Sequence, residues 1–89
     1  MSTTSTPLKA LIVDDEMTNR LILRSLLKKQ GYETVEAKDG KEAVDLFVQE
    51  SPSIVFMDVM MPVMDGYEAT RIIKSKSGKS FIPIIFLTA

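Results

Sequence analysis

The stretch IVFMDVMMPVMDG, residues 54–66, decides the fold. Four apolar residues precede Asp58, which is typical of a strand buried inside a sheet. Pro62 and the pair Asp65-Gly66 then predict a loop before the next helix. Asp58 is therefore expected at the carboxyl end of a strand, which is the edge where ligands bind in open α/β sheets.

A second acidic strand end lies near the N-terminus. Residues 1–7 are polar and are expected to form a disordered tail, so structure should start near Leu8. Residues 8–13 predict a short strand, and Asp14-Asp15-Glu16 follows it directly. The pattern of an apolar strand that ends in carboxylates thus occurs twice.

The other segments alternate between helix and strand patterns. The spacing of Leu23, Leu26 and Leu27 predicts a helix that begins after an N-cap at Thr18 and ends near Lys29. The alternation of strands and helices predicts a parallel α/β sheet with four strands and three helices. The later elements expected are an edge strand at 33–37, helices at 41–50 and 67–74, and a strand at 81–87 that is buried on both faces.

Composition excludes several classes of function. The chain has 89 residues and a net charge of -1, which predicts one small domain without direct nucleic-acid or membrane binding. It contains no cysteine and no histidine, so disulfides, thiolate or imidazole metal sites and nucleophile-histidine catalysis are excluded. The longest apolar stretch, residues 81–89, is far shorter than the ~20 residues of a membrane span, and the N-terminus lacks the apolar core of a signal peptide. We therefore expect a cytoplasmic protein whose chemistry depends on carboxylates and hydroxyls.

Three motifs occur in order along the chain: Asp14-Asp15-Glu16, then Asp58 with Met61-Pro62 and Asp65-Gly66, then Thr88-Ala89. Their order and spacing resemble the receiver domain of two-component response regulators, over residues 8–89. The resemblance implies a flavodoxin-like, doubly wound parallel sheet with strand order 2-1-3-4-5. It also implies a phosphoacceptor domain of phosphorelay signal transduction, which is not an enzyme in its own right.

The resemblance assigns a role to each candidate site residue. Asp58 would accept a phosphoryl group from a histidine kinase or phosphotransfer protein. Asp14, Asp15 and Asp58 would bind Mg²⁺, together with the backbone carbonyl of Met60, and Thr88 would be the hydroxyl that turns toward the phosphoryl group. The chemistry is also sound on physical grounds, because carboxylates ~5 Å apart repel by ~3 kcal/mol at an effective dielectric of ~20 and a divalent cation relieves this repulsion.

Other functions fit these residues less well. A phosphatase of the haloacid dehalogenase type needs a second aspartate two residues after Asp58, where this chain has Met60. The four methionines between positions 57 and 64 are better explained by packing than by a soft-metal site. Residues 78–80 mimic the end of a P-loop, but Ile73 replaces the required glycine. The alternative that stays open is a receiver-like interaction module that is not phosphorylated.

The sequence departs from the family pattern after Ala89. By resemblance, a receiver continues with a fourth helix, a fifth strand that carries a phosphate-pairing lysine, and a fifth helix. We therefore expect a truncated, N-terminal part of a receiver. Its last strand, residues 81–87, would be an unpaired sheet edge, so the 89-residue chain is expected to self-associate and to be phosphorylated poorly.

Overall fold

The computed structural model describes residues 8–61, 64–78 and 80–87. The tail expected at residues 1–7 therefore lies outside the described part. Strands and helices alternate along the chain, as the sequence predicts. The elements are β1 (Lys9–Val13), α1 (Met17–Lys29), β2 (Glu33–Ala37), α2 (Gly40–Glu50), β3 (Ile54–Asp58), α3 (Gly66–Lys76) and β4 (Ile84–Leu87).

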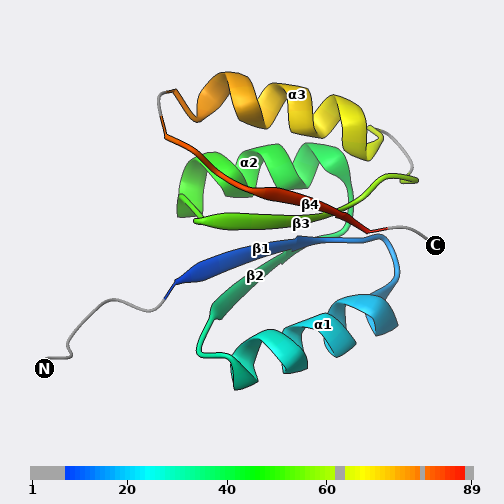
Figure 1. The fold of residues 1–89 in the computed structure, drawn as a ribbon. Coiled ribbons are helices and arrows are strands. Elements are labelled where there is room, and N and C mark those ends of the chain that lie inside the picture. Colours follow the sequence, from blue (N-terminus) through cyan, green and yellow to red (C-terminus); the bar gives the residue numbers. More distant parts are fainter. Residues whose placement is uncertain (1–7, 62–63, 79, 88–89) are drawn as a thin grey trace, which may run out of the picture.

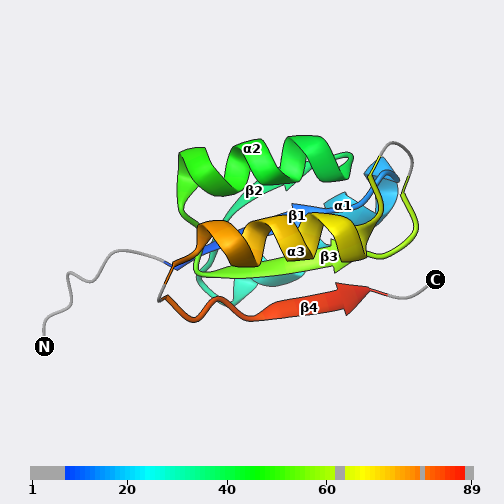
Figure 2. The ribbon, with the colours of Figure 1, turned by 90° about the horizontal axis from the view of Figure 1, so that it is seen from above.

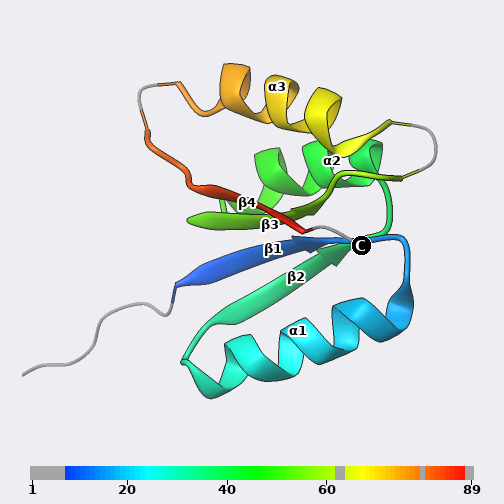
Figure 3. The ribbon, with the colours of Figure 1, turned by 45° about the vertical axis from the view of Figure 1, so that its right-hand side comes forward.

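The four described strands form one parallel sheet in the order β2-β1-β3-β4 (Figure 1). Helices α2 and α3 cover one face and α1 lies on the other, which confirms the flavodoxin-like arrangement. Viewed from the side of α2 and α3, these two helices lie beside one another across the sheet (Figure 2). Because all strands run the same way, their carboxyl ends meet at one edge (Figure 3).

Strand β1 has the most deeply buried side chains of the sheet because it has a strand on each side and helices on both faces. Its side chains alternate between two apolar clusters. Leu11 and Val13 belong to the larger cluster, under α2 and α3, and Ala10 and Ile12 belong to the smaller cluster, under α1. All four are fully buried.

Aspartates cap the two helices that lie over the larger cluster. The Asp39 carboxylate accepts a hydrogen bond from the backbone N–H of Glu42 at 2.8 Å, and the Glu42 carboxylate accepts one from Lys38 N–H at 2.7 Å. The Asp65 carboxylate accepts from Glu68 N–H at 2.9 Å, as expected of a residue that begins a helix. These caps fix where α2 and α3 start relative to the strand ends.

The N-cap expected for α1 was wrong. The helix begins at Met17, with Glu16 rather than Thr18 as the N-cap, and the Glu16 carbonyl accepts the N–H of Arg20 at 3.2 Å. Leu26 is 54% exposed, whereas Leu27 is buried. Adjacent helical residues differ by about 100° around the axis, so only one of the two leucines faces the sheet.

The expectation for the last strand was also partly wrong. Strand β4 begins at Ile84 rather than at residue 81, and within the described residues it pairs with β3 alone. Its central residues Ile85 and Phe86 are 44% and 39% exposed, so the strand is not buried on both faces. An apolar strand is buried only where neighbouring elements cover it, and the described part of the chain supplies few neighbours here.

The described helices are all shorter than a membrane-spanning helix. Helix α1 has 13 residues. Within the described segments, no helix has the length and hydrophobicity that crossing a bilayer requires.

Leu27 and Leu26 provide a matched test of the packing of α1. We expect Leu27→Ala to lower the free energy of unfolding by about 2–4 kcal/mol, because it leaves a cavity under the helix. Leu26→Ala should cost less than about 1 kcal/mol, since that side chain is already in contact with water. Urea unfolding of both variants measures this difference, and equal losses would contradict the described orientation of α1.

Candidate functional site

Three carboxylates meet at the carboxyl edge of the sheet. Asp14 and Asp15 follow β1, and Asp58 ends the neighbouring strand β3. One carboxylate oxygen of each residue lies within 4.8 Å of the others. Asp14 is buried, Asp58 is half-buried and Asp15 is exposed. The site thus has a buried side and an open side.

Asp14 is held by hydrogen bonds at both its backbone and its side chain. Its N–H donates to the carbonyl of Ala37 on β2 at 3.1 Å. Its carboxylate accepts the backbone N–H of Glu16 at 2.9 Å and the Nδ2 amide of Asn19 at 3.4 Å. Its own carbonyl accepts Nη1 of Arg20 at 2.6 Å. The position of this carboxylate is therefore determined by β2 and by the first turn of α1.

Asp58 is held by the loop that follows it. The Oδ1 atom of Asp58 accepts the backbone N–H of Met60 at 3.1 Å. Gly66, the first residue of α3, donates its N–H to the carbonyl of Val59 at 3.1 Å. A Cβ atom at Gly66 would collide with the Asp58 carbonyl and would lie 2.8 Å from Val59 Cα. The Asp65-Gly66 pair thus lets α3 begin directly against the end of β3.

The surroundings of Asp58 disfavour its charge. Burial raises the pKa of the Asp58 carboxyl above its ordinary value, and the negative charges of Asp14 and Asp15 raise this pKa further. The hydrogen bond from Met60 N–H opposes the rise. A positive charge bound nearby would therefore stabilise the ionised form of this carboxylate.

The carboxylates open onto a hollow of ≈ 200 Å³. Its donor atoms are oxygens and one amide group, which suits a hard divalent cation such as Mg²⁺ better than a soft metal. Three of the four methionines fit a packing role, since Met57 of β3 is fully buried and Met61 and Met64 pack against the larger core cluster. The packing expectation was wrong for Met60, which is 75% exposed. The residues that line the hollow are Asp14, Asp15, Glu16, Asn19, Asp58, Met60 and Leu87.

The structure brings together four of the five site residues expected from the sequence: Asp14, Asp15, Asp58 and Met60. Thr88 lies outside the described residues. The preceding residue, Leu87, is the register partner of Asp58 and lines the hollow.

Sequence reasoning missed Asn19 and Arg20, which hold Asp14 in place. Asn19 had a usable signal, because a residue five positions after Asp14 falls in the first turn of the following helix once that helix starts at Met17. Arg20 gave no such signal, since it binds a backbone carbonyl and a carboxylate on another strand.

Comparison with known proteins identifies relatives of the chain. The family model described as response regulator receiver domain matches residues 10–89. The probable transcriptional regulator ycf27 of Guillardia theta is 49% identical over 81 residues, which are 91% of this chain and 31% of that protein. Protein PilG of Pseudomonas aeruginosa is 37% identical over 89 residues, or 66% of its length. The chain thus spans about a third of the ycf27 relatives.

Solved structures show the same architecture. The chemotaxis protein CheY4 of Vibrio cholerae superposes with a TM-score of 0.85 at 33% identity, over 91% of this chain and 68% of that one. The response regulator domain of Thermotoga maritima CheB gives a TM-score of 0.84 at 30% identity, over 93% of this chain and 61% of that one. The arrangement of the four strands and three helices is therefore that of known receivers.

The raised pKa of Asp58 predicts how substitution there changes stability. Because the ionised Asp58 opposes folding, we expect Asp58→Asn to raise the free energy of unfolding at pH 7 by about 1 kcal/mol, after solvent screening of the repulsion. The gain should shrink as the pH falls through the raised pKa and should vanish below the ordinary value of 3.8, where the carboxyl is protonated in both states. Urea unfolding across this pH range measures the gain.

The matched control is Asp45→Asn, because Asp45 is an exposed aspartate of α2 that pairs with Lys41. It should show no gain at pH 7. A wild-type protein as stable as Asp58→Asn at pH 7 would show that the three carboxylates do not strain the folded state.

Proposed function

The chain belongs to the response regulator receiver domain family, and from this premise we propose that it is a phosphoacceptor that takes a phosphoryl group on Asp58. Receiver domains are parts of two-component signal transduction systems. The observation that supports the proposal most directly is the convergence of Asp14, Asp15 and Asp58 within 4.8 Å at the carboxyl edge of the sheet. An isolated acidic strand end would not need such an arrangement.

The transfer is a displacement at phosphorus. An oxygen of the Asp58 carboxylate attacks the phosphorus of a phosphohistidine on a histidine kinase or phosphotransfer protein. The new P–O bond forms as the P–N bond breaks, and the imidazole nitrogen keeps the electron pair of the broken bond. The product is an acyl phosphate on Asp58. We propose that the chemistry of the domain is limited to its own phosphorylation and dephosphorylation, so we do not assign it as an enzyme.

Mg²⁺ is the proposed cofactor because the donor set is rich in oxygen and carries three negative charges. Asp14, Asp15 and Asp58 would hold the ion, together with the Met60 carbonyl. A bound divalent cation neutralises charge on the phosphoryl oxygens during transfer. Asp14 enters the site with its position already fixed by hydrogen bonds, whereas the exposed Asp15 has room to adjust.

The phosphoryl group would act as a switch through added charge. It brings negative charge and acceptor oxygens to the end of β3, beside Leu87 at the end of β4. Thr88, the next residue, is proposed as the hydroxyl that responds. The proposed location is the cytoplasm, with histidine kinases or phosphotransfer proteins as partners. A receiver-like module that signals through protein contacts without phosphorylation is the alternative.

Phosphate labelling separates these two functions. With Mg²⁺ and a small donor such as acetyl phosphate, a protein that carries this chain within a complete receiver should incorporate phosphate, and Asp58→Asn in that protein should abolish the incorporation because the accepting oxygen is lost. Asp45→Asn should label as the wild type does, since Asp45 lies on the exposed face of α2. Labelling of Asp58→Asn at the wild-type level would exclude Asp58 as the acceptor, and no labelling of the wild type would favour the unphosphorylated module.

We also propose that the 89-residue chain self-associates through β4. This strand pairs with β3 alone among the described strands, so its other edge offers backbone N–H and C=O groups to a second copy. Ile85 is 44% exposed and lies on the α1 side of this strand, since its register partner Phe56 packs against the smaller cluster. Ile22 and Leu26 of α1 are more than half exposed on the same side, where an apolar hollow of ≈ 340 Å³ lies between α1 and the end of β4. Contiguous exposed apolar surface of this kind favours association.

Gel filtration with light scattering tests the association. The chain should elute as a dimer or larger species at micromolar concentrations, and Ile85→Glu should shift it toward the monomer by placing a charge in the apolar surface beside the pairing edge. Val48→Glu is the matched control, because Val48 is 59% exposed but lies on α2. A monomeric wild type at all concentrations would contradict the proposal.

A further inference from the structure

One arginine connects the acidic site to the rest of the fold without entering the hollow. Arg20, on the first turns of α1, donates from Nη1 to the Asp14 carbonyl at 2.6 Å and from Nε to the Glu36 carboxylate on β2 at 3.2 Å. Its side chain is only 16% exposed. A single planar guanidinium therefore ties three elements together: the end of β1, α1 and β2.

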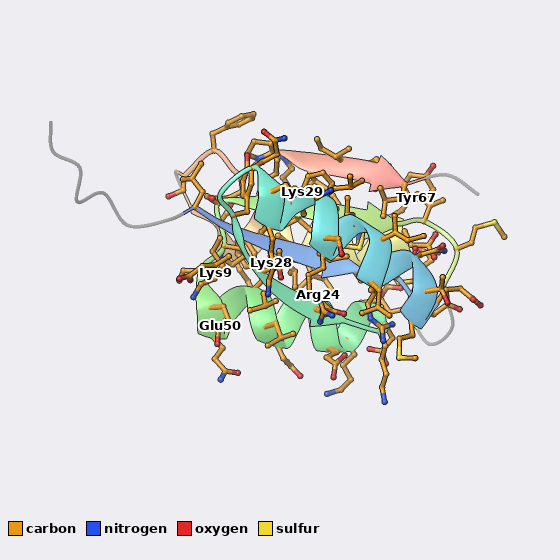
Figure 4. The ribbon with its side chains drawn as sticks, turned by 90° about the horizontal axis from the view of Figure 1, so that it is seen from below. Lys9, Arg24, Lys28, Lys29, Glu50 and Tyr67 are labelled. Atoms are coloured by element: carbon orange, nitrogen blue, oxygen red, sulfur yellow. The ribbon has the colours of Figure 1, made fainter. Side chains whose placement is uncertain are left out.

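A second arginine holds the same glutamate but not the site. Arg24, one turn further along α1, donates from Nη1 to the other Glu36 oxygen at 2.9 Å. Figure 4 shows Arg24 beside β2, on the lower face of the molecule. Arg20 and Arg24 thus share residue type, helix and partner, and they differ in the bond to the Asp14 carbonyl.

We propose that Arg20 is a positioning residue for the divalent-cation site, because its bond to the Asp14 carbonyl fixes the peptide that joins Asp14 to Asp15. This inference rests on the proposed function of the site. The orientation of that peptide determines where both aspartate side chains leave the backbone. Asp15 depends on it most, because its exposed side chain has less protein around it to hold it in place.

The fork geometry of arginine explains why this residue type is needed. A guanidinium donates from several N–H groups in one plane, so one group can bind a carbonyl while another binds a carboxylate. Glu36 orients the guanidinium of Arg20 through its own bond to Nε. A lysine ammonium is a single point charge that would serve one of the two partners well and the other poorly.

The sign of the expected effect separates positioning from simple electrostatics. Removing a positive charge beside an acidic cluster should, by Coulomb's law alone, tighten the binding of a cation. Removing the residue that holds the Asp14-Asp15 peptide should weaken it. Substitution of Arg20 by methionine makes these two effects oppose one another, so the direction of the change in affinity identifies the role.

The experiment is a Mg²⁺ titration of the protein followed by amide NMR shifts. We expect Arg20→Met to bind Mg²⁺ about tenfold more weakly than the wild type, the size usual for loss of a residue that orients metal ligands. Arg24→Met removes the same charge and the same kind of bond to Glu36, and its affinity should stay within about twofold of the wild type. Asp15→Ala, which removes a ligand, should lose at least tenfold and calibrates the assay. Equal or tighter binding by Arg20→Met would overturn the proposal.

A second readout needs no metal. The N–H of Glu16 donates to the Asp14 carboxylate, so its hydrogen exchange in metal-free protein reports whether that side chain keeps its place. Arg20→Met should speed this exchange relative to core amides of β1 such as Leu11, whereas Arg24→Met should not. A purely structural role would instead speed exchange at all these amides by similar factors in both variants, and that result would overturn positioning.

Two further outcomes keep the test decisive. If Arg20→Met does not fold, Arg20→Lys is the fallback variant because it retains the charge. We expect Arg20→Lys to lose part of the Mg²⁺ affinity. Wild-type affinity in a folded Arg20→Lys would overturn the proposal. If the wild type binds no Mg²⁺, the proposed cofactor is wrong. The exchange of Glu16 N–H then still decides whether Arg20 holds Asp14.

Discussion

The parallel pairing of β1 with β3 is the constraint on which the site depends. Val13 lies opposite Met57 in this pairing, so the next residue on each strand, Asp14 or Asp58, emerges at the same edge. Parallel strands thereby force like charges together, which is unfavourable by a few kcal/mol at short range. Only a rigid scaffold can keep such groups converged, and the fully buried β1, held between two strands, provides that rigidity.

The unfavourable charge cluster explains the distribution of hydrogen bonds around it. The backbone N–H of Glu16, the amide of Asn19 and the guanidinium of Arg20 all donate to Asp14. The backbone N–H of Met60 donates to Asp58. Each of these donors stabilises a negative or partly negative oxygen that its neighbours repel. The remaining repulsion favours the proposed divalent cation, because the fold brings the negative charges together and a bound cation would neutralise them.

Much of this arrangement was predictable from the sequence, because the patterns involved are local. The apolar runs that end in Asp14 and Asp58 and the pair Asp65-Gly66 all report on a few adjacent residues. Long-range features were not predictable. The exposure of Ile85 on β4 depends on which elements cover that strand, and the bond between Arg20 and Glu36 joins residues 16 positions apart on different elements. The N-cap at Glu16 was missed because the backbone, not the side chain, begins that helix.

The two faces of the sheet differ in a way that couples packing to the site. Under α2 and α3 the apolar cluster is large, whereas the face under α1 retains a hollow bordered by exposed apolar side chains. That hollow and the acidic one share three lining residues, Asp14, Asn19 and Leu87. A group that fills the apolar hollow must therefore touch side chains that also shape the acidic site. Conversely, charge added at Asp58 would change the field on the same three residues, so we expect a group bound in one hollow to change the free energy of binding in the other.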